Sequence, residues 1–168
     1  MSQSTRRPLA SPLVALVAVL AALAPGAPAE AQELKERIAI AMEMITAGAR
    51  EILEEEMILT DKQKEAFWPL YDEYAAKRRE IGQRYVRLIG AYLDRYQAGS
   101  LTDDDADLIL DVYFDIEMDT LQLQQRYVRR FRKIMPGIKV ARFFQLESKI
   151  RAEVDQALAL AIPLADPR

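Results

Sequence analysis

The apolar and aromatic residues between positions 67 and 92 constrain the fold of this chain most strongly. The series is Phe67, Tyr71, Tyr74, Arg78, Ile81, Tyr85, Leu88 and Tyr92. Its steps alternate between four and three residues, which is the repeat by which one helix packs lengthwise against another. Similar helical spacing continues through most of the chain after residue 32, without sustained strand-like alternation. We therefore expect an all-α fold.

Helix-starting and helix-ending residues divide the chain into about four predicted helices. The expected spans are roughly 33–57, 61–98, 103–135 and 138–161. Gly99 suits the left-handed conformation that often follows a helix end, and Pro136-Gly137 interrupts the third span. We expect the second and third helices to form a long antiparallel hairpin, and residues 32–168 to form one domain.

The first 31 residues have the pattern of a cleaved export signal. Arg6 and Arg7 provide a short basic region, and residues 13–23 form an apolar segment that is short for a membrane span. Ala29-Glu30-Ala31 has the small-x-small pattern of a signal peptidase site. We expect cleavage near Ala31 and a periplasmic protein without an integral membrane segment; the alternative is an uncleaved anchor.

The composition argues against an enzyme and against nucleic acid as a partner. The chain contains no histidine and no cysteine, so the commonest general base, thiol nucleophiles and the usual transition-metal ligands are missing. Removing Arg6, Arg7 and Glu30 from the 23 basic and 26 acidic residues leaves 21 and 25, a net charge of −4. We expect no catalytic residue, no cofactor and no disulfide, with packing alone holding the fold.

An internal repeat relates the second predicted helix to the third. At an offset of 42 residues, Leu59-Thr60-Asp61 matches Leu101-Thr102-Asp103. The segment 83–87 matches 125–129 without a mismatch, since both read Gln-Arg-Tyr-Val-Arg. Because 42 is a multiple of seven, both helices keep the same facing. The repeat predicts a hairpin with approximate two-fold symmetry.

Charge is distributed unevenly along the third predicted helix. Residues 103–119 contain eight acidic and no basic side chains, whereas residues 120–146 contain seven basic and no acidic ones. Asp103, Asp107, Asp111, Asp115 and Asp119 form a stripe at four-residue spacing, whose like charges need favourable neighbours. Three explanations remain open. An antiparallel hairpin would bring Arg95, Arg87 and Arg84 near Asp105, Asp111 and Asp115 for salt bridges. Otherwise the acidic half can contact the basic half of a second copy, or the stripe can bind a cation.

Both predicted hairpin helices begin with a capping sequence. Thr60 can accept from the backbone N–H of Gln63, whose side chain can accept from the N–H of Thr60. Thr102 and Asp105 repeat the arrangement, with Leu59 and Leu101 preceding the two caps. Pro69, inside the second helix, removes one backbone hydrogen bond and should bend the helix.

These features resemble the LTxxQ group, the Spy and CpxP family of bacterial periplasmic proteins. The resemblance rests on the export signal, the helical pattern, Leu59-Thr60-Asp61-Lys62-Gln63 and the degenerate copy at residues 101–105, which lacks the glutamine. It implies four helices, an extended cradle-like homodimer, and ATP-independent chaperoning of unfolded envelope proteins or accessory roles in envelope stress. The alternatives that it implies are docking on the periplasmic domain of a sensor kinase and metal sensing. Metal sensing suits this chain poorly, because metal-responsive relatives depend on histidine ligands.

The resemblance also implies where a partner binds, since family clients contact mixed basic and apolar surfaces. The corresponding residues here are Trp68, Tyr71, Tyr74, Arg126, Arg129, Arg130, Arg132 and Lys133. The aromatic residues among them have a second interpretation, because helical spacing of aromatic side chains is also the pattern of a packed core.

Overall fold

The computed structural model describes residues 28–166, and this part of the chain forms four α-helices. They are α2 (Pro28–Glu56), α3 (Asp61–Gln97), α4 (Asp103–Phe131) and α5 (Gly137–Ala161). No strand occurs within these residues, which confirms the predicted all-α fold. The helix predicted to end near Met135 ends at Phe131 instead, because the N–H groups of Lys133 and Ile134 turn back to the carbonyls of Arg130 and Phe131.

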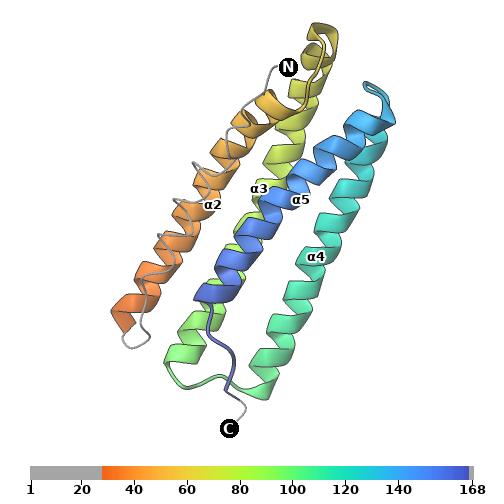
Figure 1. Ribbon diagram of the computed structural model, residues 1–168. Helices are drawn as coiled ribbons and strands as arrows, with labels where there is room; N and C mark the ends of the chain where they lie inside the picture. Colours follow the sequence, from red (N-terminus) through yellow and green to blue (C-terminus); the bar gives the residue numbers. More distant parts are fainter. Residues whose placement is uncertain (1–27, 167–168) are drawn as a thin grey trace, which may run out of the picture.

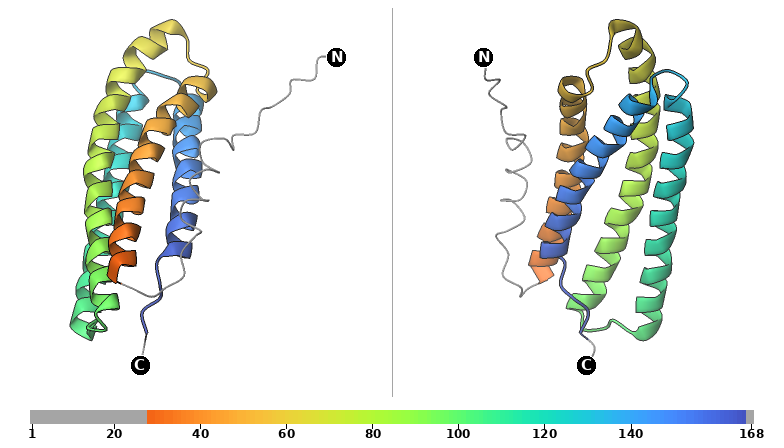
Figure 2. Two further views of the ribbon diagram at one scale, coloured as in Figure 1. Left: turned by 90° about the vertical axis from the view of Figure 1, so that its left-hand side faces the viewer. Right: turned by 45° about the vertical axis from the view of Figure 1, so that its right-hand side comes forward.

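Each helix runs antiparallel to the one before it (Figure 1). α3 packs against both α2 and α4, and α2 also packs against α5. α4 lies at the edge of the bundle, with its neighbours on one side (Figures 1 and 2). Among the helices of residues 28–166, none covers one long face of α4.

The predicted export signal lies mostly outside the described residues. Residues 1–27 are not described, and α2 begins at Pro28, before the expected cleavage site at Ala31. Within the described part of the chain, every helix is too short or too polar to cross a membrane.

Both predicted capping boxes are present. The Thr60 hydroxyl accepts from the Gln63 N–H at 3.3 Å, and the Gln63 side-chain oxygen accepts from the Thr60 N–H at 3.1 Å. Thr102 and Asp105 form the same pair of bonds, and the hydrogen bonds from Thr102 lower the pKa of the Asp105 carboxyl. Gln63 has a second role, because its side-chain oxygen also accepts from the Lys139 ammonium of α5 at 2.7 Å. The motif thus starts α3 and ties it to α5.

The turn between α3 and α4 has the predicted glycine geometry. Gly99 has a φ of 60°, and the N–H groups of Gly99 and Ser100 donate to the carbonyls of Tyr96 and Arg95. These two bonds close a Schellman motif, which needs a left-handed residue at this position. The turn sets the antiparallel register of α3 and α4.

An aromatic cluster fills the end of the bundle that contains the α2–α3 and α4–α5 connections. Phe67, Tyr74, Phe131 and Phe143 are fully or almost fully buried there. The ring centroids of Phe131 and Phe143 lie 4.7 Å apart, and Phe67 lies 5.4 Å from Phe131 and 5.6 Å from Phe143. Burial of each such ring stabilises the fold by about 1.5–3 kcal/mol. The cluster holds α3, α4 and α5 together.

An aliphatic cluster fills the opposite end of the bundle. Its buried members come from α2, α3 and α5: Leu34, Ile38, Ile89, Leu93, Ala157 and Leu158. None of these buried members comes from α4. The N-terminal half of α4 is therefore held mainly by α3, which leaves more of its surface open to solvent.

Replacement of the first cap tests the motif. We expect Thr60→Ala to lower the free energy of unfolding by about 1 kcal/mol, because the Gln63 N–H loses its acceptor. Thr60→Ser keeps that acceptor and should retain most of the stability. Chemical denaturation followed by circular dichroism measures both variants; equal stability of Thr60→Ala and the parent would contradict the assignment.

The connection before the motif contains a strained residue. Ile58 has a φ of 47°, which is unfavourable for a β-branched side chain, and this side chain is 72% exposed. We expect Ile58→Gly to raise the free energy of unfolding by about 1 kcal/mol, since glycine accepts this conformation without a steric penalty. Ile58→Val keeps the branching and should not stabilise. Thermal melts of both variants measure the effect, and a melting temperature of Ile58→Gly no higher than that of the parent would contradict the prediction.

Candidate partner-binding surface

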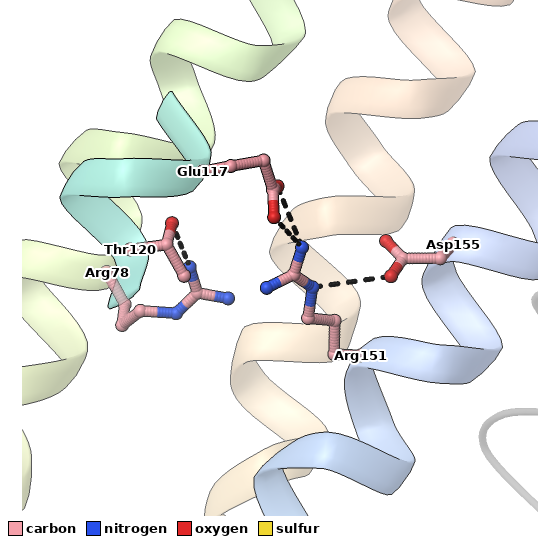
Figure 3. A network of polar contacts seen from close by, with 5 residues as sticks. All are labelled: Arg78, Glu117, Thr120, Arg151 and Asp155. Atoms are coloured by element: carbon pink, nitrogen blue, oxygen red, sulfur yellow. Dashed lines mark hydrogen bonds and ion pairs between the residues drawn. The ribbon is translucent and has the colours of Figure 1, made fainter. Parts of the chain in front are cut away.

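A layer of polar contacts separates the aromatic cluster from the aliphatic cluster. Arg78, the polar position of the predicted seam, donates to the buried hydroxyl of Thr120 at 3.2 Å. Arg151 donates to both carboxylate oxygens of Glu117 at 2.7 and 2.6 Å, and to Asp155 at 3.3 Å. Figure 3 shows these five side chains converging from α3, α4 and α5. The layer fixes the three helices in one register.

The Glu147 carboxyl on α5 has a raised pKa. Burial disfavours its charged form and raises the pKa, although the Tyr74 hydroxyl donates to its carboxylate at 2.7 Å and Arg78 lies nearby. Tyr74 is itself buried, and burial together with Glu147 raises the pKa of its hydroxyl. The pair is a structural contact between α3 and α5.

Two of the predicted partner-binding aromatic residues belong to the core. Tyr71 and Tyr74 are buried in the aromatic cluster, so the prediction that they lie on an exposed surface is wrong. The physical reason is that the seam of α3 is covered by α4 and α5 at this level. The same burial raises the pKa of the Tyr71 hydroxyl to about 12. The core interpretation of the spacing is confirmed for these two residues.

Trp68 lies at the margin of the aromatic cluster. It is half-buried, and its ring meets Phe67 and Tyr71 edge to face at 5.0 and 5.6 Å. The Arg50 guanidinium of α2 covers the ring at 4.4 Å from its centroid and also pairs with Asp72 at 2.6 Å. Trp68 therefore joins α2 to α3 and presents little free ring surface.

The basic residues predicted to bind a partner separate into two groups. Arg130 holds Glu73 of α3 through two bonds of 2.6 Å, and these bonds, with one from the Tyr127 hydroxyl, lower the pKa of Glu73 to about 2. Arg130 is thus part of the α3–α4 contact. The other four are exposed around the C-terminal end of α4: Arg126, Arg129, Arg132 and Lys133.

Two aspartates of the acidic segment 103–119 pair across the hairpin, and only one of these two, Asp119, belongs to the stripe. Arg95 contacts Asp105 at 2.8 Å, as predicted, and Arg84 pairs with Asp119 rather than with Asp115. Asp103, Asp107, Asp111 and Asp115 are exposed. Within residues 28–166, three or more acidic side chains nowhere converge in a way that could hold a metal ion. The two observed pairs confirm the antiparallel register.

The structure contains an exposed apolar stripe that the sequence reasoning missed. It consists of Leu110, Phe114, Met118 and Leu121 on α4, with exposed fractions of 51, 63, 55 and 50%. The buried face of α4 carries Ile116, Thr120, Leu123, Tyr127 and Phe131 and points the other way. The steps of four, four and three residues are visible in the sequence. However, aspartates lie between the members of the row, so the segment has the pattern of an acidic helix face. We call these four residues the α4 outer stripe.

The α4 outer stripe continues directly into charged residues at both ends. With the same helical spacing it extends through Gln125 to Arg129 and Arg132, and in the other direction to Asp107 and Asp103. All five of these residues are exposed. The resulting face is acidic at one end, apolar in the middle and basic at the other end.

Comparisons with models of known protein families, with characterised proteins and with solved structures give no match.

Acidification tests the buried carboxyl. Because the folded state raises the pKa of Glu147, its charge destabilises the fold at neutral pH, and this penalty disappears as the pH falls through the raised pKa. We expect Glu147→Gln to raise the melting temperature at pH 7, with a gain that shrinks as the pH is lowered. Glutamine keeps an acceptor for the Tyr74 hydroxyl.

Glu73→Gln is the matched control, with the opposite sign. Its lowered pKa means that the charged form stabilises the fold above the ordinary carboxyl pKa, and this contribution is lost as the pH falls toward about 2. We expect this variant to melt at a lower temperature at pH 7. Equal pH profiles for the two variants would contradict both assignments.

Proposed function

We propose that this protein is a non-enzymatic, chaperone-like binding protein of the bacterial envelope, which holds unfolded polypeptides without ATP. The observation that carries the proposal is the α4 outer stripe joined to the exposed arginines Arg129 and Arg132. Four large apolar side chains, each at least half exposed, form one continuous row on the face of α4 that no other part of the described chain covers. Such a row is typical of a surface that binds another chain.

The chemistry of this surface indicates the kind of client. An unfolded polypeptide exposes apolar side chains, which can bury the ring of Phe114 and the flexible side chain of Met118 without requiring one shape. The basic end of the face favours client segments in which acidic residues flank the apolar ones. A rigid helix that presents this face needs no rearrangement to bind.

The remaining features support the same class of protein. The export pattern of residues 1–31 and the LTxxQ resemblance both favour the periplasm and a role in envelope stress. The absence of histidine and cysteine from the sequence disfavours the commonest catalytic and metal-sensing chemistries. We place client binding on the outer face of α4 rather than on Tyr71 and Tyr74, which are buried.

Suppression of client aggregation tests the proposal. We expect the full chain to suppress the aggregation of a chemically reduced or heat-unfolded client at near-stoichiometric ratio, as measured by light scattering. Phe114→Asp combined with Met118→Asp should remove most of this activity, because two charges interrupt the apolar row. Both positions are exposed, so circular dichroism should show an unchanged fold.

Leu160→Asp is the control for these substitutions. Leu160 lies on α5 and is 77% exposed, so it matches the exposure and chemistry of the test positions but lies outside the α4 outer stripe. This variant should suppress aggregation as well as the parent does. A parent chain that suppresses nothing across a range of ratios, or a Leu160→Asp variant as defective as the α4 variant, would refute the proposed site.

A further inference from the structure

We propose that Met118 is a redox-sensitive modification site, and that oxidation of its sulfur to the sulfoxide by a peroxide reversibly weakens client binding. The inference rests on the proposed function, because it concerns regulation of the same surface. The point of control is one atom, the Met118 sulfur, inside the α4 outer stripe.

The methionine side chains that the structure describes differ sharply in exposure to solvent. Met57 and Met135 lie in the core, with exposed fractions of 1 and 5%. Met118 and Met44 are 55 and 54% exposed. A peroxide in solution reaches a thioether sulfur only where the side chain is accessible. Among these four methionines, Met118 and Met44 are therefore the ones open to oxidation in the folded chain.

The composition makes methionine sulfur the preferred target of an oxidant. The sequence contains no cysteine, and a cysteine thiolate is the side chain that usually consumes peroxide first. The single tryptophan, Trp68, is half-buried, and the Arg50 guanidinium covers its ring. Oxidation of the described side chains should therefore fall first on Met118 and Met44.

The modification is a two-electron oxygen transfer. The sulfur lone pair attacks one oxygen of hydrogen peroxide, so that an S–O bond forms and the O–O bond breaks. The proton of the transferred oxygen moves to the departing hydroxide, which leaves as water. The sulfur is oxidised by two electrons and the peroxide is reduced by two. A sulfoxide reductase reverses the step, because the oxygen leaves as water while a dithiol becomes a disulfide.

Oxidation changes the polarity inside the α4 outer stripe. Phe114 lies four residues before Met118 and Leu121 three residues after it, so the sulfoxide stands between two exposed apolar side chains. The sulfoxide oxygen is a polar acceptor, and an apolar client segment that covers it offers no donor in return. The flexible apolar contact of the thioether is lost at the same time. The oxidised face should bind apolar segments less well.

The same change leaves the fold intact. The buried face of α4 is formed by other residues, among them Ile116, Thr120 and Leu123. In the free protein the oxidised side chain stays in water, and its oxidation adds no net charge. Oxidation of Met118 therefore alters what α4 binds without unfolding the bundle.

Met44 provides an internal comparison. It lies on α2, one turn after the exposed Ile40, and it matches the exposure of Met118. Because it lies outside the α4 outer stripe, its oxidation should leave client binding unchanged. Accessibility thus determines which sulfurs react, and position determines which reaction affects the client.

Peptide mapping by mass spectrometry tests the chemistry. The full chain is treated with hydrogen peroxide, the reaction is stopped at intervals, and the sulfoxide fraction is measured at each methionine. We expect Met118 and Met44 to oxidise at least about tenfold faster than Met57 and Met135, because the last two are buried. Equal rates at all four positions, or an unreactive Met118, would overturn the inference.

Suppression of client aggregation tests the consequence. The full chain carrying Met44→Leu is assayed with a heat-unfolded client before oxidation, after oxidation and removal of peroxide, and after treatment with the reductases for both sulfoxide epimers. We expect oxidation to raise the ratio of chain to client needed for half suppression by about fivefold. The reductases should restore the original ratio, and circular dichroism should show an unchanged fold throughout.

Three results of this assay would overturn the inference. The first is unchanged suppression when Met118 is fully oxidised. The second is a loss of suppression that the reductases do not reverse. The third is a loss that follows the sulfoxide fraction at another methionine rather than at Met118.

The unoxidised chain separates this inference from the proposed function. Suppression by the unoxidised chain that survives oxidation of Met118 refutes the inference and leaves the proposed function standing. An unoxidised chain that suppresses nothing refutes the proposed function, and the inference with it. Slower oxidation of Met118 in the presence of client, with the rate at Met44 of the parent unchanged, supports both, because the client then covers the sulfur.

Discussion

The contact between Phe131 and Phe143 determines how the rest of this molecule is arranged. The two rings lie 4.7 Å apart on either side of the α4–α5 connection, and Phe67 of α3 packs against both. Because the chain contains no cysteine, no disulfide can replace this packing. The contact anchors α4 at its C-terminal end, while the aliphatic cluster at the other end uses no buried residue of α4. The exposure of the α4 outer face follows from this one-sided attachment.

Polar contacts specify the register that the aromatic packing alone would leave free. Arg78 and Arg151 bind acceptors on neighbouring helices between the two clusters, and Arg95 with Asp105 closes the far end of the hairpin. A shift of α4 by one turn would break these bonds together. Surface pairs of this kind add little stability each, but their directions leave one arrangement satisfied. The outer face of α4 is thereby held in a fixed orientation.

Local sequence signals predicted local structure well and surface exposure less well. Thr60, Gln63 and Gly99 specify helix ends through bonds with near neighbours, and those bonds are present as expected. Tyr71 and Tyr74 follow the same spacing whether they are packed or exposed, and only the placement of α4 and α5 buries them. Leu110 and Phe114 show the converse, since an apolar helical row normally predicts a buried face. They are exposed because no helix of the described residues packs on that side of α4, and local sequence does not determine this arrangement.

The proposed binding face of α4 can be tested most directly at Met118. A single cysteine introduced by Met118→Cys can be labelled selectively with a polarity-sensitive dye, because the chain has no other cysteine. Leu160→Cys provides the matched position on α5. Addition of an unfolded client should shift the emission of the dye at position 118 to shorter wavelength and leave the dye at position 160 unchanged. An unchanged spectrum at position 118 while the client binds, or a shift confined to position 160, would contradict client binding on this face of α4.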